Sequence, residues 1–212
     1  MVGRLDELRP ELMGRPALAL MLIIAVACSD GQARTPGGES VVKALPPTID
    51  SILPPDEAIR RFVGGTKPPA GLEGGAASAD ELAKSLFDAL DGADSAALAR
   101  MVISRAEYGF LYYPTSLYAK KPYELAPDVA WMLSSEASAK GARRLLDRLG
   151  GRGLQLIGLR CARDTTEGRN QLRQHCSVAY RNEHGATERR QLFQAIIERD
   201  GAAKFLSYAG DF

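Results

Sequence analysis

Four short segments in the last third of the chain alternate apolar and polar residues, and they predict the strands of one antiparallel sheet. The segments are residues 154–161, 174–181, 191–198 and 204–208. Asp200-Gly201 separates the last two and is typical of a tight hairpin, because glycine adopts the positive φ that such a turn needs. A looser turn is expected at residues 182–185, and the polar residues 164–170 are expected to connect the first two strands.

The first two segments have a predictable register. If Cys161 opposes Cys176, two further pairs follow: Leu159 with Val178, and Ile157 with Tyr180. All six side chains then share one face, whereas a slip of one residue would place them on both faces. This register predicts a Cys161–Cys176 disulfide. The alternative is a pair of buried thiols, and the cellular compartment decides between them.

The residues before these strands carry helix signals. Ser78 with Glu81, and Ser104 with Glu107, have the spacing of capping boxes. Helices are expected at residues 78–92, 96–102, 104–114, 127–133 and 138–149, with a proline at the first helical position of the fourth.

Helices followed by strands indicate the α+β class. We expect residues 78–212 to form one domain, with helices packed on a curved antiparallel sheet of about four strands. This plan, with its closing hairpin at residues 198–208, resembles the nuclear transport factor 2-like (cystatin-like) superfamily. The resemblance implies a half-cone sheet with a concave mouth beneath its helices. It implies no single activity, because this fold hosts enzymes and binding proteins alike.

The N-terminus predicts export. Residues 17–27 are uncharged and apolar, too short to span a bilayer but of the length found in signal peptides. The sequence Ala25-Val26-Ala27-Cys28 resembles the lipobox of bacterial lipoproteins, although Ala25 stands where that family usually has leucine. The resemblance implies a signal peptide at 1–27, a lipid on Cys28, and attachment to the bacterial cell envelope at the periplasmic face of the outer membrane. The alternatives are an ordinary secretory signal and no signal at all, and translation starts at Met1 or at Met13.

Cysteine usage agrees with this location. The chain has three cysteines, and a lipid on Cys28 leaves only Cys161 and Cys176 to pair. An exported protein meets an oxidising compartment, where a disulfide persists.

Residues 28–77 are rich in glycine, proline and small polar residues, a composition typical of a flexible linker. A short helix is possible near residues 56–63, where acidic residues would occupy its first turn. The sequence leaves open whether this helix packs on the domain.

Charge and motifs point to few kinds of chemistry. The 27 basic and 26 acidic residues are balanced, which argues against a nucleic-acid partner. His175 and His184 stand outside any metal-binding spacing and are interpreted as a strand and a turn residue. The chain contains no phosphate- or dinucleotide-binding motif, so no metal and no cofactor are predicted.

Aromatic residues concentrate between residues 108 and 131, and they predict either a pocket or a core layer between helices and sheet. The candidate pocket residues are Tyr108, Tyr112, Tyr113 and Trp131. We expect a lipid-anchored envelope protein that binds a protein partner or a small apolar ligand without catalysis. One alternative is a hydrolase or isomerase, which like ketosteroid isomerase would need a carboxylate and a tyrosine in the cone. The other is a purely structural envelope protein.

Overall fold

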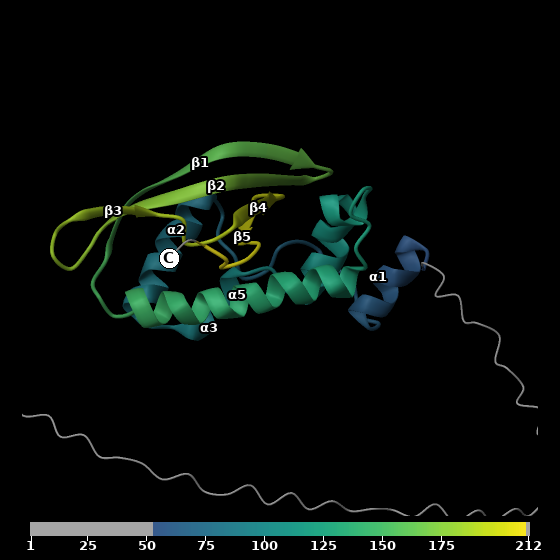
Figure 1. Ribbon diagram of the computed structural model, residues 1–212, viewed down its shortest axis with the longest axis horizontal. Helices are drawn as coiled ribbons and strands as arrows, with labels where there is room; N and C mark the ends of the chain where they lie inside the picture. Colours follow the sequence, from purple (N-terminus) through teal and green to yellow (C-terminus); the bar gives the residue numbers. More distant parts are fainter. Residues whose placement is uncertain (1–52, 211–212) are drawn as a thin grey trace, which may run out of the picture. The chain divides into compact units, whose positions relative to one another are not determined.

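The computed structural model describes residues 53–210, so the predicted signal peptide and Cys28 lie outside the described residues. The described part has the predicted α+β class, with helices first and strands after them (Figure 1). The helices are α1 (Pro55–Val63), α2 (Ala79–Asp91), α3 (Ser95–Met101), α4 (Arg105–Glu107) and α5 (Pro127–Leu149), with the short turns η1 (Tyr108–Tyr112), η2 (Tyr113–Thr115) and η3 (Leu117–Ala119) between α4 and α5. The strands are β1 (Gln155–Glu167), β2 (Asn170–Arg181), β3 (Thr187–Arg190), β4 (Ala195–Arg199) and β5 (Ala202–Phe205).

Within residues 53–210 the strands form one five-stranded antiparallel sheet, where about four strands were expected. The order is β1-β2-β4-β5, and β3 also pairs with β2. The additional strand arises because residues 187–199 form two short strands, β3 and β4, in place of the single one predicted at 191–198. The predicted hairpin at Asp200-Gly201 is confirmed, with φ values of 51° and 79° that fit a primed turn.

The register of β1 and β2 is confirmed around the cysteines. Cys161 opposes Cys176 and the two form a disulfide, and Leu159 opposes Val178. The predicted pairing of Ile157 with Tyr180 is wrong, because a bulge between Leu156 and Gly158 places Leu156 opposite Tyr180. Ile157 is the extra residue of this bulge, and the residue is 54% exposed instead of buried.

The β1–β2 hairpin is longer than predicted. Residues 164–167 and Asn170 were expected to connect the strands, but they continue the ladder as far as the pair Glu167–Asn170. The turn is thereby reduced to Gly168-Arg169, and Gly168 has a φ of +63°. The hairpin consequently reaches past the cysteines and passes close to η2, since a Cβ on Gly168 would lie 2.8 Å from the Thr115 side chain.

Most of the predicted helix ends are confirmed. Ser104 and Glu107 form the reciprocal capping box that opens α4. At α2 only half of the predicted box forms: the Ser78 side chain accepts from the Glu81 N–H, but the Glu81 carboxylate accepts from the N–H of Ala77.

The two helices predicted at 127–133 and 138–149 are one continuous helix, α5, which begins at Pro127 as expected. Figure 1 shows α5 running beneath the β1–β2 hairpin. Gly141 lies in the middle of α5 without breaking it. It contacts the Tyr208 backbone so closely that a Cβ would lie 2.0 Å from the carbonyl oxygen, so its lack of a side chain is used for packing.

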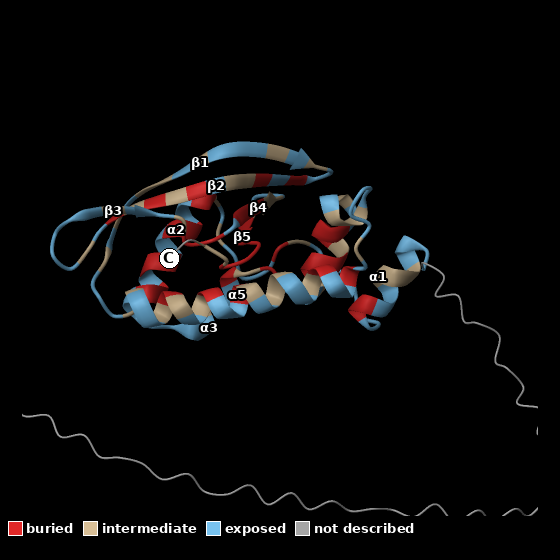
Figure 2. Cartoon of the chain, viewed as in Figure 1, coloured by how far each residue is buried: buried red, intermediate tan, exposed pale blue. Residues whose placement is uncertain are grey.

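Two groups of buried side chains lie on either side of β4. Ile196 belongs to one core with Leu82 and Leu86 of α2, whereas Ile197 belongs to a second core with Tyr108 and Leu111. Both faces of this strand are therefore covered. Figure 2 shows the contrast with β1, much of which is exposed.

Helix α1 packs on the second core, which answers a question that the sequence leaves open. The Arg105 guanidinium donates to the Phe62 carbonyl oxygen at 2.7 Å and lies 4.5 Å from the centre of the Phe62 ring. Gly109 permits the close approach of α1, because a Cβ at this position would lie 2.6 Å from the Val63 side chain. The predicted linker after α1 is also attached: Leu72 is buried, and Ala76 pairs with β5. Both segments thus belong to the same compact unit as the sheet.

A buried ion pair ties this linker to the helices and the sheet. Glu107 and Lys204 are 2% and 3% exposed, and their charged groups lie 2.9 Å apart. The Glu107 carboxylate also accepts from the backbone N–H groups of Glu73 and Ser104, and the ammonium donates to the Glu73 carbonyl oxygen. Burial alone would raise the pKa of Glu107, but these donors hold that pKa below its usual range.

Candidate functional site

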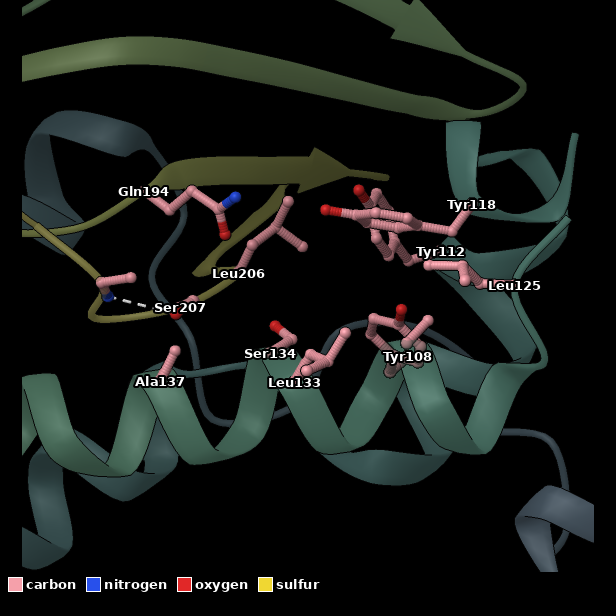
Figure 3. Close-up of a pocket in the computed structure, with 12 residues that line it drawn as sticks. Tyr108, Tyr112, Tyr118, Leu125, Leu133, Ser134, Ala137, Gln194, Leu206 and Ser207 are labelled. Atoms are coloured by element: carbon pink, nitrogen blue, oxygen red, sulfur yellow. Dashed lines mark hydrogen bonds between the residues drawn. The ribbon is translucent and has the colours of Figure 1, made fainter. Parts of the chain in front are cut away.

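A cavity of about 180 Å³ lies between α5 and the segment that follows β5 (Figure 3). The α5 side chains form its floor, and three tyrosines from η1 and η3 close one end. Its lining is Tyr108, Tyr112, Tyr118, Leu125, Ala130, Leu133, Ser134, Ala137, Gln194, Leu206, Ser207 and Ala209. Leu133 and Gln194 are exposed, so the cavity reaches the protein surface beside them.

The volume limits what can enter. Apolar cavities of about 150 Å³ are large enough to bind benzene, while pockets for drug-sized ligands occupy about 300–1,000 Å³. A cavity of about 180 Å³ therefore fits a molecule with one ring or a short branched chain.

Two of these tyrosines, Tyr108 and Tyr112, are positioned by a π-helical turn. The capping box of α4 fixes the start of this segment, and η1 then continues it as one π-helical turn from Tyr108 to Tyr112. Such turns are frequent at functional sites. The Tyr108 ring lies at the centre of the aromatic cluster, with ring centroids 5.1 Å from Trp131 and 5.4 Å from Tyr112. The ring positions are therefore set by packing.

The Tyr108 hydroxyl is the most unusual polar group of the cavity. The residue is 1% exposed, and the hydroxyl has no hydrogen-bond partner among the described residues. Figure 3 shows it directed into the space between α5 and the Tyr112 ring. Burial raises the pKa values of Tyr108 and Tyr112 far above the ordinary tyrosine value, so both phenols remain protonated hydrogen-bond donors.

The remaining polar lining groups are neutral. Ser134 and Ser207 contribute hydroxyls, and Gln194 contributes an amide at the end opposite the tyrosines. No acidic, basic or histidine side chain lines the cavity within the described residues. A ligand held here consequently meets hydroxyl groups, an amide and apolar surface.

One carboxylate lies near the cavity without lining it. Glu167, the last residue of β1, is half-buried, and burial raises its pKa. Its charge contributes to the raised pKa of Tyr112, which places the two groups in the same neighbourhood. One Glu167 carboxylate oxygen is buried without a hydrogen-bond partner in the described structure, and Glu167 is not among the residues that line the cavity.

The four predicted pocket residues do not all line the same hollow in the structure. Tyr108 and Tyr112 line the cavity. Tyr113 is buried and does not line it, because its hydroxyl donates to the Leu125 carbonyl oxygen at 2.8 Å. Trp131 lines a different hollow, an apolar groove of about 370 Å³ between α3 and α5. The aromatic segment therefore provides both a core layer and a cavity wall, the two interpretations that the sequence leaves open.

Sequence reasoning missed most of the other lining residues. Tyr118 stands in the aromatic segment and could have been included on that ground. Gln194 and Leu206 belong to the strand region, and only the fold brings them opposite α5. No local pattern marks them as cavity residues.

Residues 53–210 show neither a metal site nor a membrane-spanning helix. No group of three or more histidine, cysteine, aspartate or glutamate side chains is placed to hold a metal ion there. His175 is exposed on β2, and His184 is exposed in the turn between β2 and β3. No helix in this range is long and apolar enough to cross a membrane.

Comparison of the chain with known protein families, curated proteins and solved structures finds no match. Its function is therefore inferred from the cavity itself.

Proposed function

We propose that this protein is a lipid-anchored protein of the bacterial cell envelope that binds a small, mainly apolar molecule in the cavity beneath its sheet, without catalysis. The observation that carries the proposal is the cavity between α5 and the C-terminal segment, lined by apolar residues, tyrosines and neutral polar groups. A half-cone arrangement of the nuclear transport factor 2-like type is part of the proposal. It is supported by helices that pack against an antiparallel sheet and leave a hollow between them.

The anchor rests on the sequence. The apolar residues 17–27 and the lipobox-like Ala25–Cys28 support export and a lipid on Cys28. The disulfide between Cys161 and Cys176 agrees with an oxidising compartment. A protein anchored in this way would meet small apolar molecules of the envelope at the membrane surface.

The lining favours binding over catalysis. An isomerase or hydrolase in this cavity would need a carboxylate or histidine within reach of the ligand and a group to orient it. Glu167 is the nearest candidate that the electrostatics indicate, and it is not a lining residue. The neutral groups present can position a ligand but provide no general base at pH 7.

Titration of the purified protein with ethylbenzene, followed by calorimetry and by NMR, tests this proposal. We expect saturable binding, with the largest chemical-shift changes at the cavity residues. Ala137→Leu should abolish binding, because Ala137 lines the cavity and the added side chain would fill it.

Ala139→Leu is the matched control, since Ala139 is on the same helix but lines the groove between α3 and α5. The proposal is wrong if ethylbenzene does not bind, or if Ala137→Leu binds it as well as the unmodified protein. Loss of binding in Ala139→Leu alone would show that ethylbenzene binds in the groove between α3 and α5 and not in the cavity.

A further inference from the structure

The buried hydroxyl of Tyr108 carries an inference about the chemistry of the ligand. Within the described part of the protein, this hydroxyl alone among the tyrosine hydroxyls is fully buried without a hydrogen-bond partner. The other deeply buried tyrosines that do not line the cavity are satisfied: Tyr113 donates to the Leu125 carbonyl oxygen and Tyr208 to that of Leu98, each at 2.8 Å. The contrast marks Tyr108 as a donor that no described protein group satisfies. Because the hydroxyl oxygen is itself buried, an acceptor in the cavity reaches it when the ring shifts slightly toward the cavity.

From this contrast we infer that the ligand is an uncharged molecule with a hydrogen-bond acceptor, such as a carbonyl or ether oxygen, which receives the hydrogen bond of Tyr108. The inference rests on the proposed function, because it assigns the ligand of that same cavity. The acceptor would lie at the tyrosine end, and the apolar part of the molecule would lie between Leu206 and the α5 side chains.

Two observations favour an uncharged ligand that accepts a hydrogen bond. No charged side chain lines the cavity, so a buried ion would be left uncompensated, which is strongly unfavourable. The phenol of Tyr108 stays protonated, because its burial disfavours the phenolate. A ligand group that only donates would leave the buried Tyr108 proton unsatisfied, so it would gain less than an acceptor does.

The shape of the site also gives the hydrogen bond a fixed direction. The Tyr108 ring is held by Phe62, Tyr112 and Trp131, with centroid distances of 5.1–6.2 Å. A ring packed on several sides can move only slightly, so the hydroxyl selects for the position of the acceptor as well as for its presence. Tyr112 and Tyr118 point into the same space and could add contacts to a ring or chain (Figure 3).

A pair of nearly isosteric probes tests the inference. Acetophenone and ethylbenzene differ by a carbonyl in place of a CH₂ group, so their affinities compare a molecule that accepts a hydrogen bond with one that does not. We expect the unmodified protein to bind acetophenone more tightly by roughly five- to tenfold, the factor associated with one hydrogen bond. Tyr108→Phe should remove this preference while retaining the binding of ethylbenzene.

Tyr113→Phe is the matched control, because it makes the same chemical change at the next tyrosine but one in the aromatic cluster, outside the cavity lining. The preference should survive in that variant. A second readout needs no substitution: the ¹³C resonance of the acetophenone carbonyl should shift downfield on binding, as expected when the oxygen accepts a hydrogen bond.

The outcomes separate the two claims. If both probes bind with equal affinity and Ala137→Leu abolishes both, the acceptor inference is overturned and the proposed function stands. If the preference persists in Tyr108→Phe, the donor is another group and the assignment to Tyr108 is overturned. If neither probe binds, the proposed function and the inference fall together.

Discussion

Glu107 and Tyr108 are adjacent in the chain and almost equally buried, at 2% and 1% exposed, yet the protein surrounds their polar groups in opposite ways. The Glu107 carboxylate accepts from two backbone N–H groups and from the Lys204 ammonium. The Tyr108 hydroxyl has no partner in the described part of the chain. Both residues also donate a backbone hydrogen bond to Ser104, Glu107 to its hydroxyl and Tyr108 to its carbonyl oxygen, so the difference lies in what surrounds each side chain.

This difference separates a buried polar group that stabilises the fold from one that we propose binds a ligand. A buried polar group without a partner costs about 1–3 kcal/mol, and a satisfied one contributes modestly to stability. Glu107 joins α4, the linker and β5, so it has a structural explanation. Tyr108 has none, because a phenylalanine would pack in the same aromatic cluster without this cost. Its hydroxyl is explained by the ligand that we propose.

The largest expected effect is on the structural side of this comparison. Lys204→Met removes one partner of a buried ion pair, and such changes cost about 3–5 kcal/mol because they leave the other charge uncompensated. Urea unfolding at pH 7 measures this loss. Replacing Glu107 by glutamine in the same chain should recover part of it, since no buried charge remains. A loss below about 1 kcal/mol would show that the pair contributes little and would weaken the comparison.

A smaller loss of stability is expected when the disulfide, which lies apart from Glu107 and Tyr108, is removed. Cys161→Ala opens a disulfide that closes a loop of 15 residues, which stabilises a fold by about 3 kcal/mol in the chain-entropy model. Cys176 lies in the core next to α2, not in the aromatic core beside the cavity, so ethylbenzene affinity of the folded protein should not change.

Thermal unfolding with and without reductant checks this expectation. The variant should melt well below the unmodified protein under oxidising conditions and close to it under reducing ones. The double variant with Cys176→Ala controls for a reactive thiol. A deficit of equal size under both conditions would mean that the side chains, and not the bond, provide the stability.

The features that could be predicted from the sequence depend on residues close together or on a strict repeat. The capping box at Ser104 follows from a spacing of three residues, and the Cys161–Cys176 register follows from the two-residue period of strands. The prediction failed at Ile157, because a bulge adds one residue to one strand and the alternating pattern does not show where.

The candidate site was predictable only in part, for a related reason. The high density of aromatic residues between residues 108 and 131 could be seen in the sequence. That density does not show which ring borders a cavity and which lies within a core. Tyr108 and Tyr112 line the cavity, Trp131 lines the groove between α3 and α5, and Tyr113 lines neither hollow. The second role of Glu107 depends on Lys204, which is 97 residues away, and contacts at such a separation leave no local pattern.

The signs of two stability changes, measured at pH 7 without added ligand, test most directly whether the Tyr108 hydroxyl serves the fold or a ligand. Glu107 has a lowered pKa, so its stabilising effect is present above the unfolded value of about 4.3 and is lost as the pH falls through the folded value. Urea unfolding at pH 7 should therefore find that Glu107→Gln lowers the free energy of unfolding by about 3–5 kcal/mol, because it leaves the buried Lys204 ammonium without its counter-charge. Tyr108→Phe should raise it by about 1 kcal/mol, because it removes a buried donor without a partner. If Tyr108→Phe instead destabilises the protein as Glu107→Gln does, the hydroxyl is part of the fold and the assignment to a ligand is wrong.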